Sequence, residues 1–105
     1  MSQNWVKDIN EMQAKYGVHD WIENADKDKL RHYLTFRVDF LREELDETEA
    51  AMVNMDAEEI VDGLIDLCVV AIGTLDAYGV DPYKAWDEVL KANMNKEVGE
   101  KPSRP

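Results

Sequence analysis

The chain has 105 residues and a formal net charge of -11, from 23 acidic and 12 basic residues. This acidic balance argues against non-specific binding to a nucleic-acid backbone, which needs a basic stripe on the protein. A hydrophobic fraction of 45% argues against disorder throughout, and the length suits one domain with a modest core. We therefore predict a single domain over residues 1–105.

The cysteine and histidine content argues against several kinds of chemistry. Cys68 is the single cysteine, so an intrachain disulfide is impossible and the reducing cytosol is the expected compartment. The N-terminus lacks the apolar centre of a signal peptide, and the longest apolar run, residues 67–72, is too short to span a bilayer. His19 and His32 lack metal-ligand spacing and are expected at the surface or in loops. The carboxylates remain as the main chemical resource.

The first predicted helix covers residues 4–16, and Gly17 is a natural stop for it. One apolar stripe recurs at four- and three-residue steps, at Trp5, Ile9, Met12 and Tyr16. The following segment, residues 18–28, is expected to be an ordered loop that Trp21 and Ile22 hold against the body of the protein.

The second predicted helix covers residues 27–54, with Asp26 as its N-cap. A seven-residue pattern that suits antiparallel packing is formed by Leu34, Val38, Leu41, Leu45, Thr48 and Met52. Four further side chains widen the apolar surface, at Leu30, Tyr33, Phe36 and Phe40. This is more apolar surface than a lone chain of this size needs. We therefore expect a second subunit to complete the core, in a homodimer or a homotetramer.

The third predicted helix begins after Asp56, which forms a capping box with Glu59, and it continues to Tyr78. Beyond Asp66 it is apolar on nearly all sides, so we expect it to be the central, buried helix. Glycines at positions 63 and 73 lie inside this helix, where each costs up to about 1 kcal/mol relative to alanine. Close approach of a neighbouring helix or of a ligand would explain them.

The fourth predicted helix starts at Pro82, with Asp81 as its cap, and ends near Asn95. Its inner face is formed by Trp86, Val89, Leu90 and Met94. The tail from about residue 97 has no periodicity and is expected to be loose unless a partner orders it. Because no run alternates with period two for long, we predict an all-α fold, an antiparallel bundle of three to four helices.

Acidic side chains gather on one side of each of the two central helices. On a helical wheel, Glu43, Glu44 and Glu47 fall within about 100°, beside the apolar stripe. The acids of the next helix fall within about 60° of one another, at Glu59, Asp62 and Asp66. That helix contains no lysine or arginine to neutralise them. The two sets therefore predict a partly dry acidic pocket between the helices.

Such a pocket predicts a metal site. A buried carboxylate is normally protonated, paired with a base or bound to a metal. Ligands that are all oxygen favour Mg²⁺ or Mn²⁺, and the absence of an accompanying histidine argues against zinc and di-iron sites. Plainer roles stay open for two residues: Glu59 as the capping-box partner only, and Glu43 as a surface acid paired with a base.

Two acidic motifs carry a resemblance to a known family. "EELDE" (43–47) matches an E-E-x-x-E motif, and "EIVDGLIDL" (59–67) resembles the E-x-x-D helix that follows it. "VVAIGTLDAYGVD" (69–81) and "KANMNK" (91–96) extend the similarity, although Asn95 stands where serine is usual. Over roughly residues 30–96 the chain resembles the MazG-like all-α NTP pyrophosphatases, in the phosphoribosyl-ATP pyrophosphohydrolase-like branch common in phages and bacteria.

The resemblance implies hydrolysis of a nucleoside triphosphate between the α and β phosphates, with Mg²⁺ or Mn²⁺ as cofactor, in the host cytoplasm if the chain is phage-encoded. The metal ligands would come from Glu44, Glu47, Glu59, Asp62 and Asp66. The second motif admits either the Glu59–Asp62 pair or Asp66. Glu43 or Glu44 would orient the attacking water and take its proton. The residues expected to contact phosphate or base are Asn93 and Lys96, with Lys91 as a further candidate. Trp5, Trp21 and Tyr33 are alternative stacking partners for the base.

Three other functions compete with this one. An acidic interaction protein, such as a DNA mimic, predicts carboxylates that are exposed and spread apart. A nucleotide or metal sensor would keep the site but not the turnover. Phosphoribosyl-ATP hydrolysis is a sister enzymatic activity, which we rank below general NTP cleavage.

Overall fold

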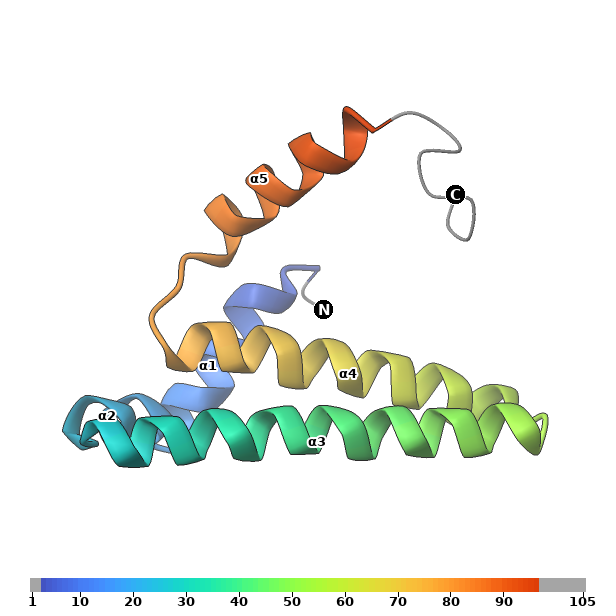
Figure 1. The fold of residues 1–105 in the computed structure, drawn as a ribbon, viewed down its shortest axis with the longest axis horizontal. Coiled ribbons are helices and arrows are strands. Elements are labelled where there is room, and N and C mark those ends of the chain that lie inside the picture. The colour runs from blue at the N-terminus through green and yellow to red at the C-terminus, as the bar shows by residue number, and fades with distance from the viewer. Residues whose placement is uncertain (1–2, 97–105) are drawn as a thin grey trace.

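The computed structural model describes residues 3–96, and every regular element in that range is a helix (Figure 1). The elements are α1 (Trp5–Lys15), α2 (Val18–Asn24), α3 (Lys27–Val53), α4 (Ala57–Ala77) and α5 (Pro82–Met94). The all-α prediction is confirmed. The predicted tail from residue 97 lies outside the described residues.

Side-chain caps fix where four of these helices begin. Asn4, Asp26 and Asp56 each accept a hydrogen bond from the backbone N–H three residues later, at 3.1, 2.8 and 3.2 Å. Asp81 accepts from the N–H of Tyr83 at 3.0 Å, and Pro82 occupies the first turn of α5. These bonds satisfy N–H groups that have no partner inside the helix. The helix starts predicted from the sequence therefore agree with the structure.

The segment predicted to be a loop is instead partly helical, because residues 18–24 form α2. Gly17 makes the sharp change of direction between α1 and α2 with φ of 73°, a conformation that favours glycine. The ring of Trp21 lies 5.4 Å from the ring of Tyr33, which holds α2 against α3. The expectation that Trp21 ties this segment to the body is met, although the loop assignment was wrong.

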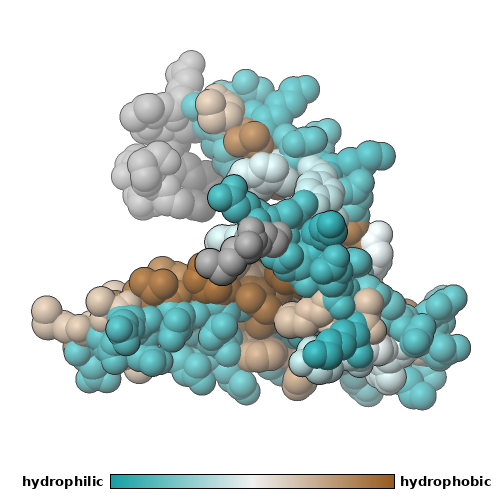
Figure 2. Space-filling model, turned by 180° about the vertical axis from the view of Figure 1, so that it is seen from behind, coloured by the Kyte–Doolittle hydropathy of each residue, from teal (hydrophilic) through white to brown (hydrophobic). Residues whose placement is uncertain are grey.

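α3 and α4 form a long antiparallel pair, and α4 contacts each of the other four helices (Figure 1). The prediction that this helix is central is therefore right, but the prediction that it is buried is not. Val61, Leu64 and Ile65 are 58%, 51% and 42% exposed. Seen from behind, apolar residues form a band along this pair beneath the part of the molecule that contains α5 (Figure 2). One flank of α4 has no covering element in residues 3–96.

Two close contacts set the register of the α3–α4 pair. A Cβ on Gly63 would lie 2.1 Å from Thr48 Oγ1, so the helices touch there through the glycine. Farther along the pair, Arg37 Nε donates to Thr74 Oγ1 at 2.9 Å. Because the helices are antiparallel, Glu44, one turn before Thr48, faces the part of α4 one turn beyond Gly63. That part of α4 contains Asp66.

α1 packs on α4 through Ile9 and Gln13, which are both buried. The predicted apolar stripe is only partly buried, because Trp5, Met12 and Tyr16 are 50%, 40% and 72% exposed. A glutamine takes the place of an apolar residue at the centre of this contact. None of the described helices has the length and apolar character needed to cross a membrane.

Candidate functional site

Glu44 lies within electrostatic reach of three other carboxylates where α3 faces α4; Glu43, Glu44, Glu47 and Asp66 are called the acidic groove below. Glu44 is half-buried, and the others are exposed. Burial raises the pKa of Glu44, and the negative charges of Glu47, Asp66 and Glu43 raise it further, in that order. The structure therefore brings together acids from both predicted motifs.

The acidic groove is more open than the sequence predicts. Glu59, Asp62 and Asp66 are exposed, because nothing in the described part of the chain covers their flank of α4. Glu59 and Asp62 are not among the groups that raise the pKa of Glu44. In residues 3–96, no three His, Cys, Asp or Glu side chains converge closely enough to hold a metal ion as they stand. The expectation of a partly dry pocket for all these acids is wrong for the single chain.

The donor chemistry of the acidic groove nevertheless suits a hard divalent cation. Its ligand atoms are carboxylate oxygens only, which are the atoms that Mg²⁺ and Mn²⁺ prefer. The acids repel one another, and a cation between Glu44 and Asp66 would relieve that repulsion. The residue types present therefore suit such an ion, although their separations in the single chain do not yet form its site.

The residues predicted to contact the substrate lie at the end of α5, outside the acidic groove. Lys91, Asn93 and Lys96 are exposed on or just after the last turn of α5. Lys96 Nζ donates to Asn93 Oδ1 at 3.1 Å, so these two side chains bind each other. α5 runs away from the α3–α4 pair, so the end of this helix lies apart from the two helices that carry the acidic groove (Figure 1).

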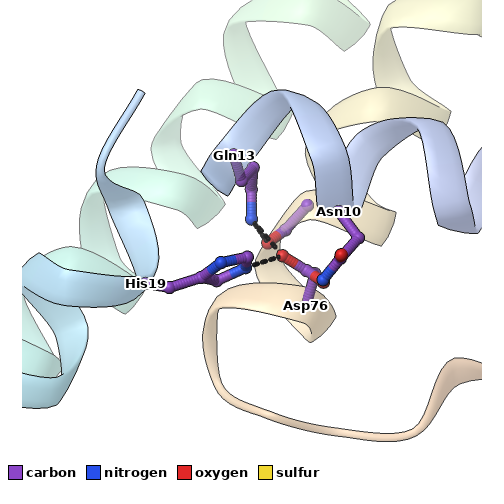
Figure 3. Close-up of polar contacts among 5 residues, drawn as sticks. Asn10, Gln13, His19 and Asp76 are labelled. Atoms are coloured by element: carbon purple, nitrogen blue, oxygen red, sulfur yellow. Dashed lines mark hydrogen bonds and ion pairs between the residues drawn. The ribbon is translucent and has the colours of Figure 1, made fainter. Parts of the chain in front are cut away.

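A second polar cluster joins α1, α2 and α4, and sequence reasoning missed it (Figure 3). Asp76 is the centre of this polar junction. Its Oδ1 accepts from Asn10 Nδ2 at 2.7 Å, and its Oδ2 accepts from Gln13 Nε2 at 2.7 Å and bonds His19 Nε2 at 2.6 Å. Gln13 Nε2 also donates to the carbonyl of Gly73 at 3.0 Å. His19, predicted to be a surface or loop residue, therefore lies on a helix, where it is paired and partly exposed.

The electrostatics of the polar junction differ from those of the acidic groove. The side chain of Asp76 is only 9% exposed, and this burial acts to raise its pKa. Hydrogen bonds from Asn10, His19 and Gln13 outweigh the burial and lower the pKa. Asp76 is thus held as a fully partnered carboxylate. An aspartate inside the apolar half of α4 was the available signal, but its partners lie some sixty residues earlier in the chain.

A cleft of about 840 Å³ lies between the start of α1, α4 and α5. Trp5, Tyr83 and Trp86 are its aromatic lining residues. Of the three base-stacking candidates, Trp5 borders open space, whereas Trp21 and Tyr33 lie against each other.

Comparison with known families finds a match to phosphoribosyl-ATP pyrophosphohydrolase (PRA-PH) over residues 21–93. Neither curated proteins nor solved structures gave a significant match. The matched range contains both acidic motifs, all of α3 and α4, and most of α5; it leaves out α1 and His19. The chain belongs to the phosphoribosyl-ATP pyrophosphohydrolase family of the MazG-like all-α NTP pyrophosphatases, and its activity is of the pyrophosphohydrolase type, on acid anhydrides.

Proposed function

We propose that this protein hydrolyses nucleoside triphosphates between the α and β phosphates, releasing a nucleoside monophosphate and pyrophosphate, with Mg²⁺ as cofactor. The observation that supports this most is that, besides burial, the charges of Glu47 on α3 and Asp66 on α4 raise the pKa of Glu44. These side chains come from both acidic motifs of the family, and their repulsion is what a divalent cation would offset.

Glu44, Glu47 and Asp66 are the proposed metal ligands, and Glu59 or Asp62 would complete the set. When bound, the cation neutralises phosphate oxygens and lowers the pKa of a coordinated water. Glu43 is exposed next to Glu44, where its carboxylate would orient the attacking water and accept its proton. Most of the catalytic effect would come from holding the water and the phosphate chain in line.

Pyrophosphate release from a panel of ribo- and deoxyribonucleoside triphosphates, with Mg²⁺ and with Mn²⁺, tests this proposal. The panel should compare wild type with Asp66→Asn and with Glu49→Gln, a matched control on an exposed acid of α3. We expect wild type and the control to release pyrophosphate and Asp66→Asn to be inactive. Absence of metal-dependent cleavage by wild type would refute the proposal and favour a sensor or an acidic interaction protein.

Phosphoribosyl-ATP is the second candidate substrate, because the matching family is described by that activity. Its triphosphate carries the same anhydride bond between the α and β phosphates, so the same acids would serve. Including phosphoribosyl-ATP in the panel separates the two candidates by their kcat/KM values.

We also propose that the working form is a homodimer or homotetramer in the cytoplasm. Large apolar side chains stay exposed on α3, α4 and α5, including Phe36, Leu45, Val61, Trp86 and Met94. A second copy would cover such surface and withdraw the acidic groove from solvent. Cys68 is unpaired, which accords with a reducing compartment. Light scattering of the purified chain at several concentrations tests the assembly.

A further inference from the structure

Arg37 holds its guanidinium rigidly against α4. Its Nε donates to Thr74 Oγ1 and its Nη2 donates to the carbonyl of Val70, both at 2.9 Å. The guanidinium carbon lies 5.8 Å from the ring centre of Tyr33 and 5.9 Å from that of Phe40. Two hydrogen bonds and two aromatic neighbours therefore fix the orientation of this half-buried side chain.

No carboxylate neutralises this cation. Within residues 3–96 the ion pairs are His19–Asp76 and Arg42–Asp39, and the two oxygens that Arg37 binds belong to neutral groups. The chain has 23 acidic residues, so a partner would be easy to supply. A partly buried charge without a counter-ion is costly, and such a cost is often retained where a ligand provides the opposite charge.

One side of the guanidinium fork is still available. An arginine has five N–H donors, and the bonds to Thr74 and Val70 use two of them. The remaining donors, on Nη1 and Nη2, have no partner among the residues that the structure describes. Their spacing matches two oxygens of one phosphate, which arginine binds in a bidentate manner.

Arg37 and Glu44 lie on the same side of α3. They are seven residues apart, which is two helical turns or about 10.5 Å along the axis. Both face α4: Glu44 is influenced by Asp66, and Arg37 bonds to Val70 and Thr74. The interface between the two helices thus contains the acidic groove at one point. Two turns away it contains a cation that has no ion-pair partner among the described residues.

We propose that Arg37 binds a phosphate group of the substrate through the free side of its guanidinium. This inference rests on the proposed function, because it concerns the same substrate. A triphosphate carries more negative charge than one divalent cation neutralises, so a further positive group would strengthen its binding. Lys91 and Lys96 lie at the end of α5, which runs away from the α3–α4 pair, whereas Arg37 bonds α4 directly.

Steady-state kinetics on Arg37→Gln and Arg37→Lys test the assignment, with Arg42→Gln as a matched control. Arg42 is an exposed arginine of the same helix, and its one ion-pair partner among residues 3–96 is Asp39. We expect Arg37→Gln to raise KM for the triphosphate about tenfold or more and to change kcat by less than about threefold, because it removes uniform substrate binding. Arg37→Lys should raise KM less, because lysine keeps the charge but not the fork. The control should keep the KM of wild type.

Thermal unfolding with pyrophosphate and Mg²⁺ gives a readout independent of turnover. Pyrophosphate should raise the melting temperature of wild type and of Arg42→Gln, and should raise it much less for Arg37→Gln. Thr74→Val removes the hydrogen-bond acceptor of Arg37 Nε but leaves the cation. The rise in its melting temperature with pyrophosphate should lie between those of wild type and Arg37→Gln. If Arg37→Gln does not fold, the KM of Arg37→Lys decides the question.

Unchanged KM in both Arg37 variants, or an undiminished pyrophosphate shift, would overturn the inference while leaving the proposed function intact. A wild type that cleaves no nucleotide and is not stabilised by pyrophosphate would overturn both.

Discussion

Asp76 in the polar junction is nearly buried and Glu44 in the acidic groove is half-buried, yet their pKa values move in opposite directions. Burial raises the pKa of each carboxyl. Three hydrogen-bond donors reverse this effect at Asp76, whereas three neighbouring carboxylates reinforce it at Glu44. The comparison shows that the partners, and not the burial, separate a structural carboxylate from one suited to a cation.

The two regions also differ in whether the chain itself supplies the partners that stabilise their charges. The polar junction uses donors from α1 and α2 and is complete within the chain. The acidic groove has repulsion that no described residue offsets. The largest effects of variants at the two sites should therefore appear in different measurements: folding for the polar junction, and activity for the acidic groove.

Glu44→Gln should have the largest effect on activity. Removing one of the proposed ligands should lower kcat/KM for the preferred nucleotide about a hundredfold or more. Glu49→Gln changes an exposed acid on the same helix and should stay within about twofold of wild type. A Glu44→Gln enzyme as active as this control would remove Glu44 from the site.

Asp76→Ala should have the largest effect on folding. It leaves three donors without their acceptor, and we expect the free energy of unfolding to fall by about 2–3 kcal/mol in urea titrations. Asp39→Ala removes an exposed aspartate paired with Arg42 and should cost less than about 1 kcal/mol. An Asp76→Ala protein as stable as the Asp39 variant would contradict the structural role of the polar junction.

Gly63→Ala tests the contact that places the acidic groove. The new Cβ would clash with Thr48 Oγ1, and we expect a loss of about 1–3 kcal/mol by thermal or urea unfolding. Thr48→Ala in the same background should recover part of that loss. Helix propensity alone predicts the reverse sign, a gain of up to about 1 kcal/mol, so a stabilised Gly63→Ala variant would rule out this contact.

The pH dependence of stability should show the smallest effect. The raised pKa of Glu44 means that the folded chain binds this proton more tightly than the unfolded chain, so its ionisation lowers stability as pH rises through and above 4.5. In metal-free buffer, Glu44→Gln should therefore melt above wild type at neutral pH, and the difference should vanish well below pH 4.5.

Asp76 should show the opposite sign. Its pKa is lowered, so its contribution is complete above the ordinary value of 3.8 and is lost as pH falls through the lower value of the folded state. Melting curves of wild type, Glu44→Gln and Asp76→Ala between pH 3 and pH 8 would separate the two residues. Stability differences that do not depend on pH would contradict both assignments.

Local sequence patterns were sufficient for most of the fold. Capping residues and helical periodicity predicted the starts of α1, α3, α4 and α5 because those signals act within a few residues. The glycines inside α4 correctly indicated close contacts, with Thr48 at Gly63 and with Gln13 and Arg37 at Gly73. Residues 18–24 were misassigned because seven residues with few apolar positions give no clear helical period.

The acidic groove and the polar junction differ in how much the sequence reveals. Helical wheels place Glu44 and Asp66 on facing sides, because both helices are long and regular. The bonds of Asp76 to Asn10, Gln13 and His19 depend on how α1 and α2 cross α4, which no local pattern specifies. The exposure of Asp62 and Asp66 was mispredicted because an apolar helix is buried only where a neighbour covers it.

Calorimetric titration of Mg²⁺ into wild type, Glu44→Gln and Glu49→Gln, with and without nucleotide, tests the central claim most directly. The claim is that the repulsion around Glu44 is relieved by a divalent cation. We predict that wild type and Glu49→Gln bind Mg²⁺ alike and that Glu44→Gln binds it at least about tenfold more weakly. Equal Mg²⁺ affinity in all three proteins, or no binding to wild type even with nucleotide present, would contradict it.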